Sequence, residues 1–403
     1  MEIWRKNLYS IWIAQFFAMV GMSMVIPFLP FYIRELGVTD SKQVEHWSGL
    51  IFAAPFISSF IFTPIWGSLG DKFGKKPMVI RAIFGLALSQ LLIFFSQDVL
   101  QLFLFRVIQG AVSGFIAASL ALVSSSAPKN KSGYAIGVLQ TSISAGTIIG
   151  PFLGGLLADI FSNYRDIFLI TTGFCFLSGI LVLINVKEPE KEINGKIFNV
   201  FQNLKFSFKS PRIRIALISI AVAQMAITLP QPIFALFIES FIKGSKYISS
   251  LTGAIVGVLG IAMVISSPYW GKRNDAKGFK NNLLFVMLGA AAALMLHLAV
   301  VNVYLLFPLR AFLGFCIGGI IPVFYSYIAK NIPSARKSGM MGIASSSTIF
   351  GNLLGPVLCT VFTLYFNIDI IFLISGILIL INAIFVWLIL PETKIESVKK
   401  QIS

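Results

Sequence analysis

The chain has 403 residues, of which 57% are hydrophobic and only 12% are charged, with a formal net charge of +16 and a mean hydropathy of +0.86. Soluble domains carry about 25% charged residues. The composition therefore excludes a soluble protein, and the spread of basic residues over separate loops excludes a nucleic-acid-binding face. The apolar runs are long and lack the alternation of barrel strands, which predicts an all-α polytopic membrane protein.

Twelve membrane helices are predicted, each where about 20 predominantly apolar residues follow one another. In chain order they cover residues 8–34, 47–69, 78–96, 99–124, 133–158, 165–186, 212–241, 248–270, 281–300, 303–329, 338–364 and 368–390. The polar segment 187–211 is predicted to be a cytoplasmic linker. It divides an N-terminal six-helix bundle, 1–186, from a C-terminal six-helix bundle with a short cytoplasmic tail, 212–403.

The lysines and arginines predict the orientation. By loop parity, 25 of the 32 fall on the side of the two termini and five on the other side, while two lie inside helices. Basic residues gather in cytoplasmic loops, so both termini are predicted to be cytoplasmic. The five on the opposite side are Arg34, Lys42, Arg165, Lys243 and Lys246.

An internal repeat is the clearest architectural signal. Residues 64–67, Asp71 and Arg106 recur 204 positions later, at 268–271, Asp275 and Arg310. Glycines and a proline of the fifth predicted helix recur in the eleventh at an offset of 205. Parallel repeats of this kind form two halves related by an axis along the membrane normal, with substrate bound between them near the midplane. Two pseudo-symmetric halves in the same orientation are therefore predicted.

With these motifs in place, the whole chain resembles the major facilitator superfamily, and within it the twelve-helix drug:proton antiporters. The stretch GSLGDKFGKKP, 67–77, matches the loop motif of the superfamily. The resemblance implies a conformational latch in which Asp71 docks on the eleventh helix, with Asp275 in a degraded second copy. The alternative is a solvated loop that only sets topology. The latch residues are Gly67, Asp71, Lys72, Gly74, Lys75, Lys76 and Asp275.

Two further motifs lie inside predicted helices. Arg106 with Gln109 resembles a second family motif, and a charge in a membrane helix is costly and points to function; extension of Arg106 to the membrane surface is the alternative. Small residues let backbones approach closely, and the resemblance associates those of the fifth helix with export, ordinary packing being the alternative. This antiporter motif comprises Gly137, Gly146, Gly150, Pro151, Gly154 and Gly155.

Proton coupling calls for a carboxylate inside the membrane, since a buried acid can load and release a proton. Most of the sixteen acids fall in loops or at predicted helix ends. Proton coupling therefore rests on the family resemblance, which implies Asp71, Arg106 and Glu239 as its candidates. The repeat matches Glu239 to Glu35 and so indicates a position at the rim. His297 is expected to pack inside its helix.

The substrate cavity is expected to be lined by helices 1, 4, 7 and 10, with parts of helices 2, 5, 8 and 11. Amides and aromatic rings there would suit amphiphilic or lipophilic cations through stacking and cation–π contact. The candidates are Gln15, Phe16, Arg106, Gln109, Gln140, Gln224, Gln231, Phe234, Phe324 and Tyr325.

The resulting hypothesis is a secondary active exporter of small amphiphilic or drug-like compounds, working by alternating access in exchange for protons. The alternative keeps the fold and exports a specific metabolite such as a siderophore or a sugar. An enzyme is disfavoured because no nucleophile–base set appears, and no cofactor, metal or nucleic acid is expected. The resemblance implies a multi-pass monomer in the bacterial inner membrane, with a small-molecule substrate, protons and membrane lipid as its partners.

Overall fold

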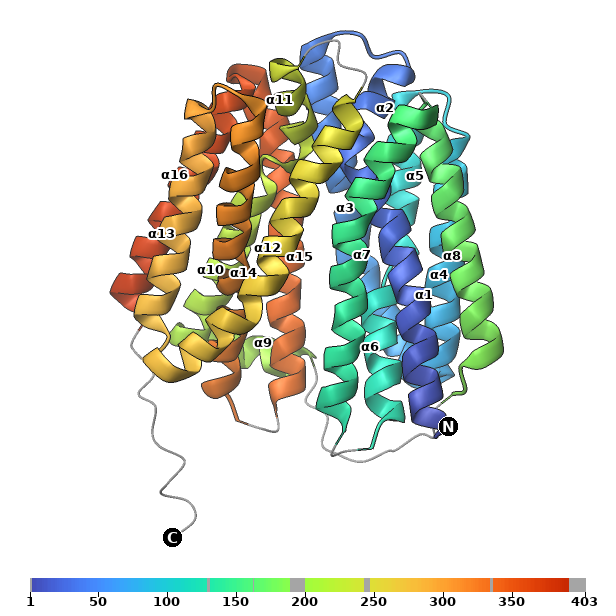
Figure 1. The fold of residues 1–403 in the computed structure, drawn as a ribbon. Helices are drawn as coiled ribbons and strands as arrows, with labels where there is room; N and C mark the ends of the chain where they lie inside the picture. The colour runs from blue at the N-terminus through green and yellow to red at the C-terminus, as the bar shows by residue number, and fades with distance from the viewer. Residues whose placement is uncertain are drawn as a thin grey trace. The chain divides into compact units, whose positions relative to one another are not determined.

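The computed structural model describes residues 2–128, 131–161, 163–188, 200–242, 247–333 and 336–390. Within them the chain is all α, and twelve helical segments are long and apolar enough to cross a membrane, so the predicted fold class is confirmed. The α-helices, labelled in Figure 1, are α1 (Ile3–Val25), α2 (Leu29–Glu35), α3 (Ser41–Phe73), α4 (Lys75–Phe94), α5 (Val99–Ala111), α6 (Phe115–Ser126), α7 (Ser132–Phe161), α8 (Arg165–Asn185), α9 (Val200–Lys209), α10 (Pro211–Thr228), α11 (Phe234–Phe241), α12 (Ile248–Lys277), α13 (Lys280–Leu296), α14 (Leu306–Lys330), α15 (Lys337–Tyr365) and α16 (Ile368–Ile389).

Several spans are interrupted at a proline or a glycine. In the first span the 3₁₀ turn Ile26–Phe28 separates α1 from α2, and in the seventh the turn Gln231–Ile233 separates α10 from α11. Each turn contains a proline, which has no N–H to continue the helical ladder. In the fourth span Gly114, at a φ of 105°, separates α5 from α6. The first and seventh spans thus share one design, as the internal repeat predicts.

The second span is longer than predicted at both ends. Asp40 caps α3 by accepting the backbone N–H of Gln43 at 2.8 Å, so the helix begins at Ser41 instead of 47. It continues to Phe73, and α4 begins at Lys75. The predicted polar loop 67–77 is therefore wrong in extent, because Gly74 is the one non-helical residue between the two helices. Its φ of 104° and ψ of 161° lie in a region essentially confined to glycine.

Contacts divide the chain into two compact units. Unit 1 comprises Met1–Asn194, Gln231–Gly260 and Pro356–Phe366, and unit 2 comprises Gly195–Pro230, Ile261–Gly355 and Asn367–Ser403. Unit 1 thus includes the whole of α11 and parts of α12 and α15 in addition to the N-terminal helices. The division at 187–211 into two six-helix domains stays a prediction, and residues 189–199 of that linker lie outside the described residues.

Each unit has its own apolar interior. In unit 1, α1 packs against α7 and α8, and α8 packs against α4. Buried side chains such as Leu8, Ile11, Leu86 and Leu122 form one continuous core among these helices. In unit 2, α13 packs against α14 and α16, and α10 packs against α16. These packed helices hold the polar side chains described next in fixed positions.

Candidate functional site

The α3–α4 turn is held by a residue that sequence reasoning missed. The carboxylate of Glu188, which follows α8, accepts the backbone N–H groups of Lys75 and Lys76 at 2.7 and 2.6 Å. The first N–H groups of a helix have no partner within the helix, and Gly74 has no side chain to supply one. A Cβ at Gly74 would also meet the Glu188 carboxylate. The Glu188 side chain therefore acts as an N-cap for α4, although it lies 113 residues later in the sequence than Lys75.

Replacing Glu188 with alanine should lower the free energy of unfolding by about 1 kcal/mol, the usual loss for a removed helix cap. Glu188→Gln keeps an acceptor oxygen and should lose less. Thermal unfolding of the purified protein in detergent measures both. An unchanged melting temperature in Glu188→Ala would show that the turn holds without this carboxylate.

The predicted latch is only partly described. The side chains of Asp71 and Asp275 lie outside the described residues, so the docking of Asp71 stays a prediction. The ammonium of Lys72 lies 5.3 Å from the ring centre of Phe73. Among the described residues, a Cβ at Gly67 would meet no atom within 4 Å.

Arg106 is buried between α5 and α3. Its guanidinium donates to Oε1 of Gln109 at 2.6 Å and to the carbonyl of Ile51 at 3.3 Å. The residue is 6% exposed, which leaves little surface for the alternative of extension toward the membrane surface. The helices touch closely here, because a Cβ at Gly110 would overlap the carbonyl of Pro55. The structure thus joins two residues of the predicted motif, Arg106 and Gln109, by a hydrogen bond.

The repeat counterpart Arg310 is also buried, on α14 in unit 2. His297 lies near it, stacks on Phe372 with 4.8 Å between ring centres, and its Nδ1 is 2.8 Å from the carbonyl oxygen of Ala293. The expected packing of His297 is thus confirmed.

The other predicted cavity residues differ in environment. Gln15 and Phe324 have no exposed surface, Phe234 is buried, and within the described residues both amide atoms of Gln15 lack a hydrogen-bond partner. Gln140 and Gln231 are exposed. In unit 2 the amide of Gln224 donates to Asn352 at 2.8 Å, and the hydroxyl of Tyr325 lies 3.0 Å from that of Thr348. In unit 1 Phe16 stacks on Trp12 with 5.5 Å between ring centres. Their contact with substrate stays a prediction.

The antiporter motif forms a close helix contact. Cβ atoms at Gly146, Gly150 and Gly154 would overlap the backbone or side chains of α1, whereas one at Gly137 would meet open space. The counterparts in unit 2, Gly351 and Gly355, lie in the same way against α10. The 205-residue repeat therefore encodes one packing arrangement twice.

Two further close contacts lie near the distal end of unit 1, which we define as the end opposite residue 2. A Cβ at Gly253 on α12 would overlap the carbonyl of Pro151 on α7, and one at Gly49 on α3 would overlap that of Pro356 on α15. Gly49 and Gly253 are 204 positions apart, and the prolines are 205 apart. We call these two contacts the distal seam.

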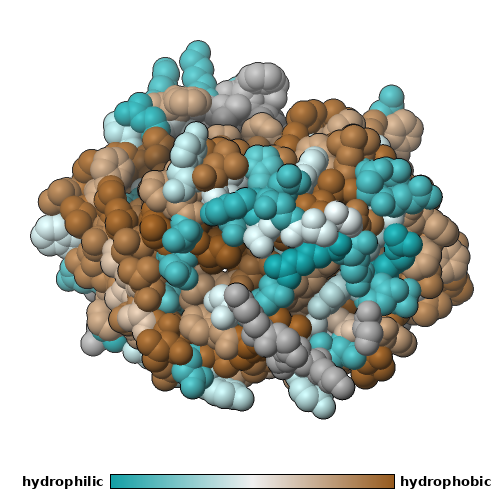
Figure 2. All heavy atoms as spheres, turned by 90° about the horizontal axis from the view of Figure 1, so that it is seen from above, coloured by the Kyte–Doolittle hydropathy of each residue, from teal (hydrophilic) through white to brown (hydrophobic). Residues whose placement is uncertain are grey.

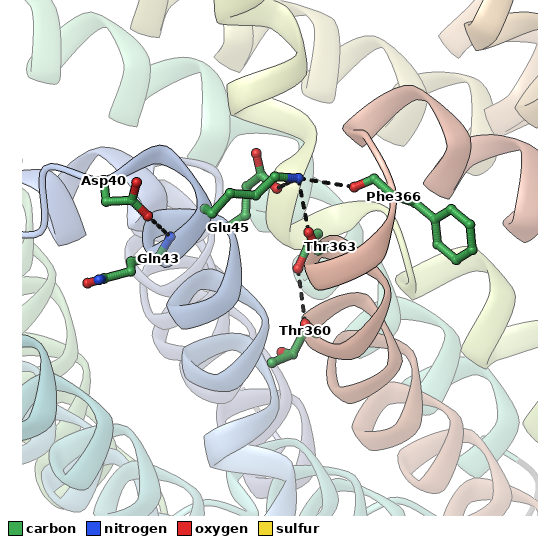
Figure 3. Close-up of polar contacts among 7 residues, drawn as sticks. Asp40, Gln43, Glu45, Thr360, Thr363 and Phe366 are labelled. Atoms are coloured by element: carbon green, nitrogen blue, oxygen red, sulfur yellow. Dashed lines mark hydrogen bonds and ion pairs between the residues drawn. The ribbon is translucent and has the colours of Figure 1, made fainter.

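Polar contacts reinforce the distal seam at helix ends. The carboxylate of Asp159 on α7 accepts the N–H groups of Ser249 and Ser250 at 3.2 and 2.8 Å, at the start of α12. Lys42 on α3 donates to the carbonyls of Thr363 and Phe366 at 3.0 and 3.2 Å, at the end of α15 (Figure 3). An anion at the start of a helix and a cation at its end both interact favourably with the helix dipole and so stabilise the helix. Figure 2 looks onto this end and shows hydrophilic side chains gathered on it.

Two more groups bind across the distal end. Arg34 donates to the carboxylate of Glu239 at 2.6 Å. The coupling candidate Glu239 is therefore ion-paired and partly exposed at the rim, which is the position that the repeat indicated. Tyr164 donates its backbone N–H to Glu35 at 2.9 Å, and its hydroxyl lies 2.9 Å from that of Ser249. Burial raises the pKa of Tyr164 to about 12, so the phenol stays protonated at neutral pH.

The structure also places Glu45 inside the distal seam. It lies one turn after Lys42 on α3, is 7% exposed, and its Oε2 is 3.4 Å from the Lys42 ammonium (Figure 3). Sequence reasoning missed it because the second helix was predicted to begin at 47, which left Glu45 in a loop. The Asp40 cap was the available signal. Among the described residues, no group of three His, Cys, Asp or Glu side chains could hold a metal ion.

Twelve apolar spans, a twofold repeat within the chain and buried polar residues inside spans define an α-helical membrane transporter. The family model of the Major Facilitator Superfamily matches residues 11–295 and 216–403. The chain belongs to this superfamily, as the motifs indicated, and is a transporter rather than an enzyme.

Curated relatives match over nearly the full length. The chain is 32% identical over 387 residues to the multidrug resistance protein MdtG of Proteus mirabilis, covering 96% of each protein. It is 31% identical over 382 residues to the protein of the same name from a Rahnella species, covering 94% of this chain and 92% of that one.

Solved structures share the fold at low identity. The nucleoside transporter NupG has a TM-score of 0.78 at 14% identity, with 95% of this chain and 99% of that chain covered. A bacterial homologue of the human lysosomal transporter Spinster has a TM-score of 0.76 at 12% identity, with 96% of both chains covered. The human organic anion transporter MFSD10 has a TM-score of 0.69 at 16% identity, with 95% and 99% covered.

Proposed function

We propose that this protein exports small amphiphilic or drug-like compounds across the bacterial inner membrane by alternating access, in exchange for protons. The observation that carries the proposal is the 30–32% identity to multidrug resistance proteins over at least 94% of the chain. The antiporter motif supports it, because Gly146, Gly150 and Gly154 pack closely on α1. The working unit in this proposal is a monomer surrounded by membrane lipid.

The proposed orientation has both termini in the cytoplasm. It rests on the excess of lysine and arginine in the loops on the side of the termini. In this orientation the α3–α4 turn with Lys72, Lys75 and Lys76 faces the cytoplasm, and the distal end of unit 1 faces the exterior. Membrane-impermeant labelling of single cysteines placed at Gln43 and at Lys72 would test it, since in intact cells only the first should react.

The proposed transport cycle alternates access to a site among the predicted cavity residues. Arg106 and Gln109 form a rigid polar pair inside the membrane, whose positive charge suits a role in coupling or in holding an anionic group. In the proposed cycle the distal seam closes the exterior side, and the α3–α4 turn, with Asp71 as its latch, closes the cytoplasmic side.

The deciding experiment is transport by purified protein in liposomes with an imposed pH gradient. A cationic dye, a fluoroquinolone-like drug, a sugar and an anionic chelator should be tested side by side. Transport of the dye or drug against its gradient, abolished by a protonophore, is expected. Transport that persists after the gradient is dissipated would overturn proton exchange.

A second candidate function keeps the fold and changes the cargo to one secreted metabolite, such as a siderophore or a sugar. The observation that favours it is the buried guanidinium of Arg106, which suits an anionic group. Deletion of the gene would then leave susceptibility to dyes and antibiotics unchanged and abolish secretion of a single compound.

Asp71→Asn should impair transport while the protein inserts normally into the membrane. The substitution keeps the size of the side chain and removes the charge that the latch requires. Drug efflux and the amount of protein in the membrane fraction measure the two effects. Wild-type efflux by Asp71→Asn would reduce the turn to a topology signal.

A further inference from the structure

We propose that Glu45 is a proton-binding site of this transporter, and that it binds its proton more tightly when the distal seam is closed. The proposal rests on the proposed proton-coupled function and adds a residue and a direction to it. The exchanged ligand is a single proton on the Glu45 carboxylate, with no other group transferred.

The burial of Glu45 is the first argument. A carboxylate taken out of water loses its hydration, and this cost falls on the ionised form. Glu45 is 7% exposed, and α15 lies against α3 beside it at the Gly49–Pro356 contact. If α15 moves away from α3, the carboxylate returns to water. Closing the distal seam therefore removes hydration from the Glu45 carboxylate.

The weak compensation of the Glu45 charge is the second argument. Charge-assisted hydrogen bonds are usually about 2.7–2.9 Å long, whereas the Lys42 ammonium is 3.4 Å from Glu45. The same ammonium points at the carbonyls of Thr363 and Phe366 at shorter distances (Figure 3). Its side chain is also half-exposed, which screens the pair. The Lys42 ammonium therefore interacts more closely with the carbonyls at the end of α15 than with the Glu45 carboxylate.

The other titratable groups near Glu45 are an aspartate, a thiol and a histidine. Asp40 precedes it on α3, and the buried thiol of Cys359 faces it from α15. His46 follows on α3, and its backbone carbonyl accepts the hydroxyl of Thr360.

The charges on the other helices packed against α3 are engaged elsewhere. Arg106 on α5 binds Gln109, Arg34 on α2 binds Glu239 on α11, and Arg81 on α4 stacks over Trp66 at 3.6 Å. Glu35, at the end of α2, accepts the N–H of Tyr164.

The direction of coupling follows from linkage. A conformation that binds a proton more tightly is favoured as the pH falls. Because closure buries the Glu45 carboxylate with a distant partner, the closed seam holds the proton more tightly than an open one. External acid should therefore shift the protein toward the closed seam, and removing protons should shift it toward the open seam. In the proposed orientation, external protons thereby favour the conformation that is closed to the exterior.

Spin labels can measure the opening of the seam without substrate. Gln43, near the start of α3, and Tyr365, the last residue of α15, are exposed positions. In Figure 3 the Gln43 side chain points away from Thr363 and Phe366. Labels at Gln43 and Tyr365, in a protein whose three cysteines are replaced by alanine and whose transport is first verified, report the distance by pulsed electron paramagnetic resonance. We expect the short-distance population to grow as the pH falls from about 8.5 to about 5.5.

Glu45→Gln is the decisive variant, because glutamine has the shape of a protonated glutamate and cannot titrate. It should keep the short distance at both pH values. Glu45→Asp should restore a pH response, and Glu35→Gln, which neutralises another acid at the same end, should respond like the wild type. The elution volume of each variant in detergent identifies any that is misfolded.

The possible outcomes separate this inference from the proposed function. A wild-type distance that ignores pH, a response that survives in Glu45→Gln, or closure at high pH instead of low pH would each overturn the role of Glu45. Gradient-driven efflux by the wild type is measured separately in liposomes. If that efflux is observed while the distance between the spin labels does not change with pH, the proposed role of Glu45 is wrong. The proposal of a proton-coupled exporter is then unaffected.

Discussion

Gly253→Ala should abolish most transport while the protein still inserts and folds. A Cβ at Gly253 would overlap the backbone carbonyl of Pro151, and backbone cannot move aside as a flexible side chain can. The methyl group therefore keeps α12 from approaching α7 at the distal seam. Efflux from liposomes and the melting temperature in detergent measure the two effects, and we expect at least a roughly tenfold fall in rate, which corresponds to about 1.4 kcal/mol.

The matched control is Gly257→Ala, one turn further along α12. A Cβ there would sit in ordinary contact, 3.5 Å from the carbonyl oxygen of Ile148. It should therefore transport like the wild type. Gly49→Ala, at the symmetry-related position on α3, should reproduce the defect of Gly253→Ala. Equal transport by the Gly253 and Gly257 variants would mean that the close contact of α7 and α12 is not needed in the cycle.

Arg106→Lys should lower the transport rate by roughly tenfold or more, even though it keeps the positive charge. The planar guanidinium reaches both the Gln109 amide and the Ile51 carbonyl, and a lysine ammonium cannot reproduce that fork. A hydrogen bond to a charged group contributes about 1.5–3 kcal/mol. Initial rates of dye efflux over a range of dye concentrations would show whether turnover or apparent affinity is lost.

Two variants separate the geometry of Arg106 from its charge. Gln109→Glu keeps an acceptor oxygen for Arg106 and replaces the neutral amide by a carboxylate. It therefore tests whether transport needs a neutral amide at this position. Lys209→Arg, at the end of α9, makes the reverse exchange of lysine for arginine on an exposed side chain and should have no effect on transport. If Arg106→Lys transports normally, the fork of contacts between α5 and α3 is dispensable and only the charge matters.

The sequence misjudged the second span for a specific reason. The predicted start at 47 was set by the beginning of the first sustained apolar run. The predicted end at 69 was set by the cluster of charges that comes next in the sequence. The helix instead follows its caps, which are Asp40 at the start and Gly74 at the end. Lys42 and Glu45 therefore lie on a helix face rather than in a loop. Because Glu45 was predicted to lie in a loop, it was not among the predicted buried acids.

The candidate site was found unevenly. The rim position of Glu239 follows from the repeat, because the relation between the two copies is fixed in the sequence. The sequence placed Arg106 and Gln109 in one motif, but only the structure shows the hydrogen bond between them. The partners of Lys42 and Glu188 do not follow from the sequence, because these contacts join residues 321 and 113 positions apart. No local pattern marks either residue as a helix cap.

The sequence by itself determined the class of this protein. Apolar runs of span length, the offsets of 204 and 205 residues and the glycines of the antiporter motif predict twelve helices in two related halves, because hydrophobicity and helix contacts depend on residue type and spacing. Only the tertiary structure decided which carboxylates are buried and which helix ends they serve. That depends on where α15 and α12 meet α3 and α7, and burial and partnership are properties of packed helices rather than of the chain.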